Sequence, residues 1–129
     1  MTRRAAALGP ADVVLFAVKL HQAEGAARDA APLFGPGTIG ISLLNGVTGP
    51  GIIAAALPGR TILPGVAYVS AVIAAPGVIR MTGGMCRMVT GAPGADAAAR
   101  ARVEDLVARC VRAGIGATLA EDVESALWE

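Results

Sequence analysis

The chain is poor in the residue types that mark several functional classes. Its 129 residues contain one lysine, one histidine and two cysteines, and aromatic residues make up only 3%. A net charge of +1, with arginines scattered along the chain, provides no basic stripe, so we expect no nucleic-acid partner. Cys86 and Cys110 match no metal-ligand spacing and no disulfide framework. We therefore expect no bound metal, and two buried, reduced thiols in a cytoplasmic protein.

Apolar residues are abundant, at 54% against 16% charged, and the mean hydropathy is +0.60. This composition can build a core, and the length corresponds to about one domain. The two long uncharged stretches, residues 30–59 and 61–79, contain prolines and glycines that break helices into short elements. Because buried parallel strands also form continuous apolar runs, we predict no membrane span and keep a small membrane-associated protein only as an alternative.

Apolar runs alternate with helix-like segments in the first half of the chain. We predict strands over residues 12–18, 38–44 and 60–69, the last interrupted at Pro64-Gly65, and helices over residues 20–34 and 51–57. Gly35-Pro36-Gly37 is expected to end the first helix. Strand–helix–strand order implies a parallel sheet. After a turn at Ala75-Pro76-Gly77, residues 78–82 and 87–90 are predicted to form short antiparallel strands.

The spacing becomes helical near residue 96. Asp96 is the predicted N-cap of a helix that Gly114 ends, residues 117–119 are a predicted strand, and Asp122 is expected to cap a last helix. That helix has only two turns of sequence, so Trp128 is interpreted as an anchor of a longer one. We interpret the chain as truncated at both ends, and we expect self-association through exposed edges of a small parallel sheet.

Lys19, the only lysine, is predicted to lie where the carboxyl end of a strand meets the N-terminus of a helix. The helix dipole disfavours a cation at that point, unless an anion such as phosphate binds beside it. The crevice outside the strand ends is also where open α/β sheets bind ligands. The alternative is a solvated surface lysine without a ligand.

Several short segments, taken in order and at compatible spacing, resemble the ketopantoate reductases, which are NADPH-dependent 2-dehydropantoate 2-reductases. The segments are Val18-Lys19-Leu20-His21-Gln22, Ser42-Leu43-Leu44-Asn45-Gly46-Val47, Gly65-Val66-Ala67-Tyr68, Pro76-Gly77-Val78-Ile79-Arg80-Met81-Thr82-Gly83-Gly84, Ala113-Gly114-Ile115 and Leu127-Trp128-Glu129. The resemblance covers the chain from about Gly9 onward, although no single segment is specific.

The resemblance implies an α/β fold. It corresponds to the C-terminal half of a Rossmann-type sheet with a short antiparallel extension, followed by the first helices of a truncated α-helical domain. Residues 1–92 would form a partial dinucleotide-binding domain. Residues 93–129 would contain the end of that domain and the start of the helical one.

The resemblance also implies a cofactor, NADP(H), and a small 2-keto acid substrate. Lys19 matches a lysine that contacts the cofactor near the reaction centre, and Asn45 matches an asparagine that contacts cofactor and substrate. Gln22 and Ala71 match further cofactor contacts. Taken alone, Asn45 could instead be a turn residue, since Asn-Gly is a common turn. His21 has no evident carboxylate partner and is assigned no catalytic role.

Two parts of the family's machinery are missing from the sequence. The Gly-x-Gly-x-x-Gly loop that opens the first helix and cradles the pyrophosphate is absent; Gly35-x-Gly37 does not replace it, because it is predicted to follow a helix and precede a strand. The general-acid lysine would follow Glu129, so no catalytic residue is present. The implied function is NADPH-dependent reduction of 2-dehydropantoate to pantoate in pantothenate and coenzyme A biosynthesis, with this chain inactive alone. The alternatives are a non-catalytic truncated remnant and a split-protein module that needs a partner chain.

Overall fold

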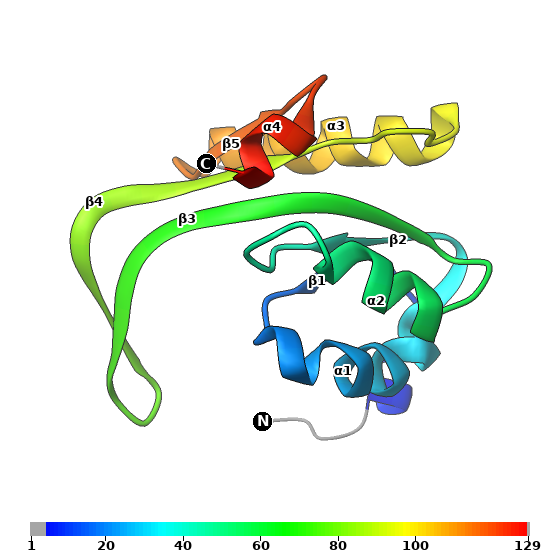
Figure 1. The fold of residues 1–129 in the computed structure, drawn as a ribbon, viewed down its shortest axis with the longest axis horizontal. Coiled ribbons are helices and arrows are strands. Elements are labelled where there is room, and N and C mark those ends of the chain that lie inside the picture. The colour runs from blue at the N-terminus through cyan, green and yellow to red at the C-terminus, as the bar shows by residue number, and fades with distance from the viewer. Residues whose placement is uncertain (1–4, 129) are drawn as a thin grey trace.

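The computed structural model describes residues 5–128, which form one five-stranded sheet with helices on both faces (Figure 1). The strands are β1 (Ala11–Phe16), β2 (Phe34–Ser42), β3 (Thr61–Ala75), β4 (Val78–Thr90) and β5 (Gly116–Leu119). The α-helices are α1 (Ala23–Ala30), α2 (Gly49–Ala56), α3 (Ala97–Arg112) and α4 (Val123–Trp128). Short 3-10 turns occupy Ala5–Ala7, Leu20–Gln22 and Ala31–Leu33.

The sheet has the strand order β1-β2-β3-β4-β5. β1, β2 and β3 are parallel, β3 and β4 form an antiparallel pair, and β4 and β5 are parallel again. This topology confirms the predicted fold class, a Rossmann-type parallel sheet with an antiparallel extension. None of the helices formed by residues 5–128 is both long and apolar enough to cross a membrane.

Separate apolar cores lie on the two faces of the sheet. On one face, Phe16 and Phe34 stack with ring centroids 6.4 Å apart beneath α1 and α2, where Ile53 is fully buried. On the other face, Ile39 and Ile41 of β2 pack against Val103 of α3. Alternate residues of a strand point to opposite faces, so β2 contributes to both cores.

Several early boundaries differ from the sequence prediction. β1 ends at Phe16, before Val18, and the segment over residues 20–34 is α1 flanked by two 3-10 turns rather than one helix. Gly35-Pro36-Gly37 does not end that helix, because Phe34 already begins β2 and these residues lie within the strand. The hydroxyl of Thr38 holds this irregular stretch by accepting a hydrogen bond from the Gly35 N–H at 3.0 Å.

The predicted interruption of the third strand at Pro64-Gly65 is wrong. β3 runs without a break to Ala75, because it changes its neighbour at this point: Pro64 is the last residue paired with β2, and Gly65 is the first paired with β4. The Pro64 carbonyl accepts hydrogen bonds at 3.0 Å from the Gly91 N–H and the Thr90 hydroxyl. The two short strands predicted over 78–82 and 87–90 are parts of the continuous strand β4.

The C-terminal predictions agree better with the structure. A carboxylate oxygen of Asp96 accepts from the Ala99 N–H at 2.8 Å and caps α3, and Gly114 follows the helix with φ of +78°.

The prediction of two buried thiols is wrong, since Cys86 is exposed and Cys110 is half-buried. Trp128 is 76% exposed and anchors no core within the described residues.

The outer part of the β3–β4 hairpin extends away from the two cores (Figure 1). We call residues 69–86 the hairpin arm. Its apolar side chains are largely solvent-exposed, and Ile73 and Ile79, which pair across the strands, are 78% and 66% exposed.

Candidate cofactor-binding cleft

A cleft of about 690 Å³ lies at the carboxyl ends of β1 and β2, where both strands give way to loops. It is lined by Ala17, Val18, Lys19, Leu20, Gln22, Leu43, Leu44, Asn45, Ala67, Val69 and Ala71. We call it the strand-end cleft. All four residues predicted to bind a cofactor, namely Lys19, Gln22, Asn45 and Ala71, therefore line one cavity.

The loop after β1 places Lys19 in a closed turn. The Lys19 N–H donates to the side-chain oxygen of Gln22 at 3.2 Å, and the Gln22 N–H donates to the Lys19 carbonyl at 2.8 Å. Lys19 therefore precedes a 3-10 turn, and α1 begins only at Ala23, so the predicted contact with the N-terminus of a long helix is corrected. The Lys19 side chain is exposed and forms no salt bridge among residues 5–128.

The loop after β2 presents Asn45. Leu44 is buried in the core below, and Gly46, with φ of +85°, turns the chain toward α2. The Leu43 N–H donates to the Phe16 carbonyl at 2.8 Å, which joins this loop to the end of β1. Neighbouring parallel strands thus bring the Lys19 and Asn45 loops to the same edge of the sheet. Asn45 is exposed rather than buried, so its amide is open to a ligand.

β3 forms the third wall of the cleft, which sequence reasoning largely missed. Ala67, Val69 and Ala71 occupy alternate positions of the strand and all line the cavity. Two of the three are alanines, so they leave room for a ligand beside the backbone. Their alternation along an apolar run was the available signal, but it is also the ordinary pattern of a half-buried strand.

Ser42, at the end of β2, is a further residue that the sequence did not single out. Its side chain is fully buried, and its hydroxyl oxygen has no hydrogen-bond partner among residues 5–128. Its Oγ atom lies 3.0 Å from where a Cβ on Gly49 would be, so a side chain at Gly49 would crowd the Ser42 hydroxyl. His21 does not line the cleft, and residues 5–128 contain no cluster of three or more metal-binding side chains. Glu129, which precedes the family's general-acid position, lies outside the described residues.

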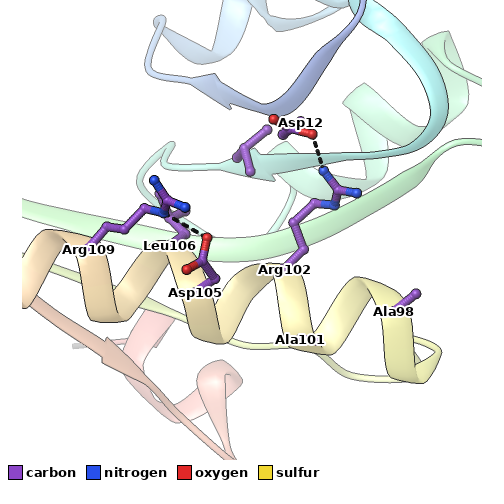
Figure 2. Close-up of a pocket in the computed structure, with 8 residues that line it drawn as sticks. Asp12, Ala98, Ala101, Arg102, Asp105, Leu106 and Arg109 are labelled. Carbon is purple, nitrogen blue, oxygen red and sulfur yellow. Dashed lines mark hydrogen bonds and ion pairs between the residues drawn. The ribbon is translucent and has the colours of Figure 1, made fainter.

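A second cavity, of about 650 Å³, lies between β1 and α3 and contains none of the predicted cofactor residues (Figure 2). An ion pair between Arg102 and Asp12 crosses it, and the Nε atom of Arg109 lies 2.7 Å from a carboxylate oxygen of Asp105. We favour the strand-end cleft as the cofactor site, because ligands of open α/β sheets bind outside the carboxyl ends of the strands.

A parallel sheet with helices on both faces and a cleft at its strand ends defines a Rossmann-type dinucleotide-binding α/β protein. The sequence profile described as "Ketopantoate reductase PanE/ApbA" matches residues 1–94. The chain belongs to this family.

Solved structures support the same assignment. A protein from Ralstonia solanacearum MolK2, described as a "putative ketopantoate reductase", superposes with a TM-score of 0.80 and 34% identity, covering 98% of this chain and 44% of that one. The 2-dehydropantoate 2-reductases from Geobacter metallireducens GS-15 and Methylococcus capsulatus give TM-scores of 0.84 and 0.80 at 26% and 29% identity, each covering 98% of this chain and 41% and 40% of theirs. The chain thus spans about two fifths of the length of these relatives. No curated protein matches it.

Proposed function

We propose that the strand-end cleft is the cofactor side of an NADP(H)-dependent 2-dehydropantoate 2-reductase, which reduces 2-dehydropantoate to pantoate in pantothenate and coenzyme A biosynthesis. The main support for this proposal is that Lys19 and Asn45, from loops after neighbouring strands, line one cavity together with small residues of β3. Family membership supports the reaction type. We further propose that the protein is cytoplasmic, that its substrate is a small 2-keto acid, and that it has no nucleic-acid partner.

The residues of the cleft fit a dinucleotide. The Lys19 ammonium group is exposed and has no carboxylate partner among the described residues, so it is available to phosphate or carboxylate groups. Ala67 and Ala71 leave space along β3. When bound, NADPH would supply the hydride that reduces the ketone.

The contribution of this chain is to hold and orient the reactants. Hydride transfer requires the nicotinamide ring and the ketone in a near-attack geometry. The Asn45 amide can donate to one partner and accept from the other, since it carries both kinds of group. The hydrogen bond between Lys19 and Gln22 limits the conformations of the loop that carries the cation. We assign residues 1–92 to the dinucleotide-binding domain and residues 93–129 to its end and the start of a helical domain.

The chain alone is proposed to be inactive. Lys19, its only lysine, lies on the proposed cofactor side, so no residue of this sequence is assigned as proton donor to the substrate oxygen. The sequence also lacks a Gly-x-Gly-x-x-Gly phosphate loop after a strand. We therefore expect the isolated chain to bind NADPH weakly or not at all, and to show no turnover.

A chimera tests the proposal. In the 2-dehydropantoate 2-reductase from Geobacter metallireducens GS-15, the region aligned with this chain is replaced by this chain, and NADPH oxidation is followed with 2-dehydropantoate. We expect turnover, and an Asn45→Ala change should lower kcat/KM by about 10²-fold, as removal of a positioned donor does in other enzymes. Thr48→Ala, in the same loop but outside the cleft, is the control. If Asn45→Ala leaves kcat/KM unchanged in a folded chimera, the proposed role of Asn45 is wrong.

The alternative that the chain is a non-catalytic remnant is tested by the same chimera. A folded chimera that binds NADPH but does not reduce 2-dehydropantoate would support this alternative. A split-protein module, the third possibility, requires a surface that accepts another polypeptide.

A further inference from the structure

Sulfur-containing side chains are concentrated in one strand of the hairpin. Residues 81–88 of β4 contain three of the four methionines and one of the two cysteines of the chain. The metal-binding clusters that residues 5–128 lack are those of histidine, cysteine and carboxylate side chains, and methionine is not among these. Thioethers and thiolates are soft ligands, which select soft metal ions.

The strand register brings Met81 and Cys86 close together. Cys86 pairs with Val69, and Met81 pairs with the β3 residue only two positions farther along, Ala71. Four residues of β4 therefore bulge out opposite a single residue of β3. Because a strand rises by about 3.3 Å per residue, the Cα atoms of Met81 and Cys86 are about 7 Å apart. The bulge thus makes neighbours of two sulfur-containing residues that are not adjacent in the sequence.

A third sulfur-containing side chain lies on the same face of the hairpin. Residues paired directly across antiparallel strands point to one face, and so do alternate residues of a strand. Met88 follows Cys86 at such an alternate position. Arg87, between them, lies on the opposite face, where its guanidinium carbon is 4.3 Å from the centroid of the Tyr68 ring. We call Met81, Cys86 and Met88 the sulfur row.

The sulfur row is open to solvent at one end. Cys86 is exposed and Met81 is 48% exposed, whereas Met88 is buried. An ion therefore reaches the row from the side of Met81 and Cys86. Neither β3 nor β4 contains an aspartate, a glutamate or a histidine. Hard divalent ions, which prefer oxygen ligands, are therefore disfavoured at this place.

We propose that the sulfur row binds one soft monovalent metal ion, of the class of Cu⁺. On binding, the Cys86 thiol releases its proton to solvent, and its thiolate and the thioether sulfurs of Met81 and Met88 become the ligands. The charge of the thiolate balances that of the ion, so no further charged group is needed, and no electron is transferred. The inference goes beyond the proposed function and requires no cofactor.

The spacing of the row suits a single ion. Bonds of about 2.3 Å between a metal ion and sulfur allow two sulfur ligands to lie up to about 4.6 Å apart. Cys86 occupies the middle of the row, so each methionine has to reach across only one neighbouring position. Methionine has three rotatable side-chain bonds and adapts to such a requirement.

The test uses the full chain with Ag⁺ as a redox-inert probe. A small monothiol is present in excess, so that a single cysteine does not retain the ion. We expect one Ag⁺ per chain, with shifted ε-methyl resonances of Met81 and Met88. Met81→Leu keeps the apolar bulk and should weaken Ag⁺ binding by roughly tenfold or more, since even the loss of an outer-shell partner costs a metal site that much. Cys86→Ser should abolish binding.

Met85→Leu and Cys110→Ser are the matched controls. Met85 is adjacent to Cys86 in β4, so it points to the opposite face, and Cys110 belongs to α3. Neither change should alter the Ag⁺ affinity.

Three results would overturn the proposal. They are a chain that retains no Ag⁺, unchanged binding in Met81→Leu, and equal losses in Met81→Leu and Met85→Leu. Because the measurement involves neither NADPH nor turnover, a failure of the proposed function would leave its outcome unaffected.

Discussion

The hydroxyl of Tyr68 on β3 donates a hydrogen bond to the Ala126 carbonyl on α4, across 2.6 Å. α4 contains six residues, too few for a stable isolated helix, so it depends on contacts of this kind. Ala67 and Val69, on either side of Tyr68, line the strand-end cleft. One strand thus carries the proposed cofactor wall on one face and holds α4 on the other.

Tyr68→Phe tests this attachment of α4. The change removes the hydroxyl but keeps the ring that lies 4.3 Å from the Arg87 guanidinium carbon. A typical hydrogen bond contributes about 1 kcal/mol, so we expect a loss of that size in the free energy of unfolding. Amide exchange should accelerate mainly in α4. Arg87→Gln, which keeps the hydroxyl, is the control. Unchanged exchange in α4 would show that the hydrogen bond does not hold the helix.

The apolar core beneath α1 and α2 should contribute most of the free energy of unfolding. Ile53 is fully buried there, and Ile53→Ala should lower the free energy of unfolding by about 2–5 kcal/mol, the usual cost of such a cavity. Ile73→Ala, on the exposed hairpin arm, should change it by less than about 0.5 kcal/mol. Urea unfolding measures both. Equal effects at the two sites would contradict the assignment of the core.

Self-association should depend on the hairpin arm as well as on the sheet edge. Ile73 and Ile79 are exposed cross-strand partners, so a Lys–Glu pair in their place keeps a favourable contact and removes apolar surface. We expect the Ile73→Lys, Ile79→Glu variant to sediment with less oligomer than the parent chain. If the oligomer fraction does not change, association occurs elsewhere, with the β1 edge as the next candidate.

As the pH is lowered, the N-terminal cap of α4 should be lost before the sheet unfolds. A hydrogen bond from the Ser125 hydroxyl, at 2.7 Å, is the main reason that the pKa of Asp122 is lowered, and the Ser125 N–H adds to it. The ionised carboxylate therefore stabilises the cap above the ordinary aspartate pKa, and this contribution fades as pH falls through the lowered value. The Ser125 amide resonance should report the change. Asp122→Asn should abolish it, and a titration unaltered in that variant would exclude Asp122 as the cause.

Part of the candidate site could be predicted from the sequence, because the carboxyl ends of neighbouring parallel strands lie at the same edge of the sheet. Lys19 and Asn45 each follow an apolar run, and parallel pairing of those runs suffices to bring their loops together. The β3 wall was harder to predict, since Pro64 usually marks a break. Here it lies where the strand exchanges one partner for another, and that depends on pairing with residues distant in sequence.

Other features depend on long-range packing and could not be read from local patterns. The ion pair between Asp12 and Arg102 joins residues 90 positions apart, and neither side chain has a local signal of the contact. Cys86 was expected to be buried because free cysteines usually are, but it belongs to a hairpin that extends beyond both cores. Asp96 and Asp122 were predictable because helix caps are local.

The most direct test of the central claim is the NADPH dissociation constant of the chimera with and without Lys19. A charged hydrogen bond contributes about 1.5–3 kcal/mol, so Lys19→Ala should weaken NADPH binding by roughly 10- to 100-fold. Arg60→Ala, which removes an exposed cation outside the strand-end cleft, should leave the constant unchanged. An equal NADPH affinity in the parent and Lys19→Ala chimeras would contradict the placement of the cofactor in this cleft.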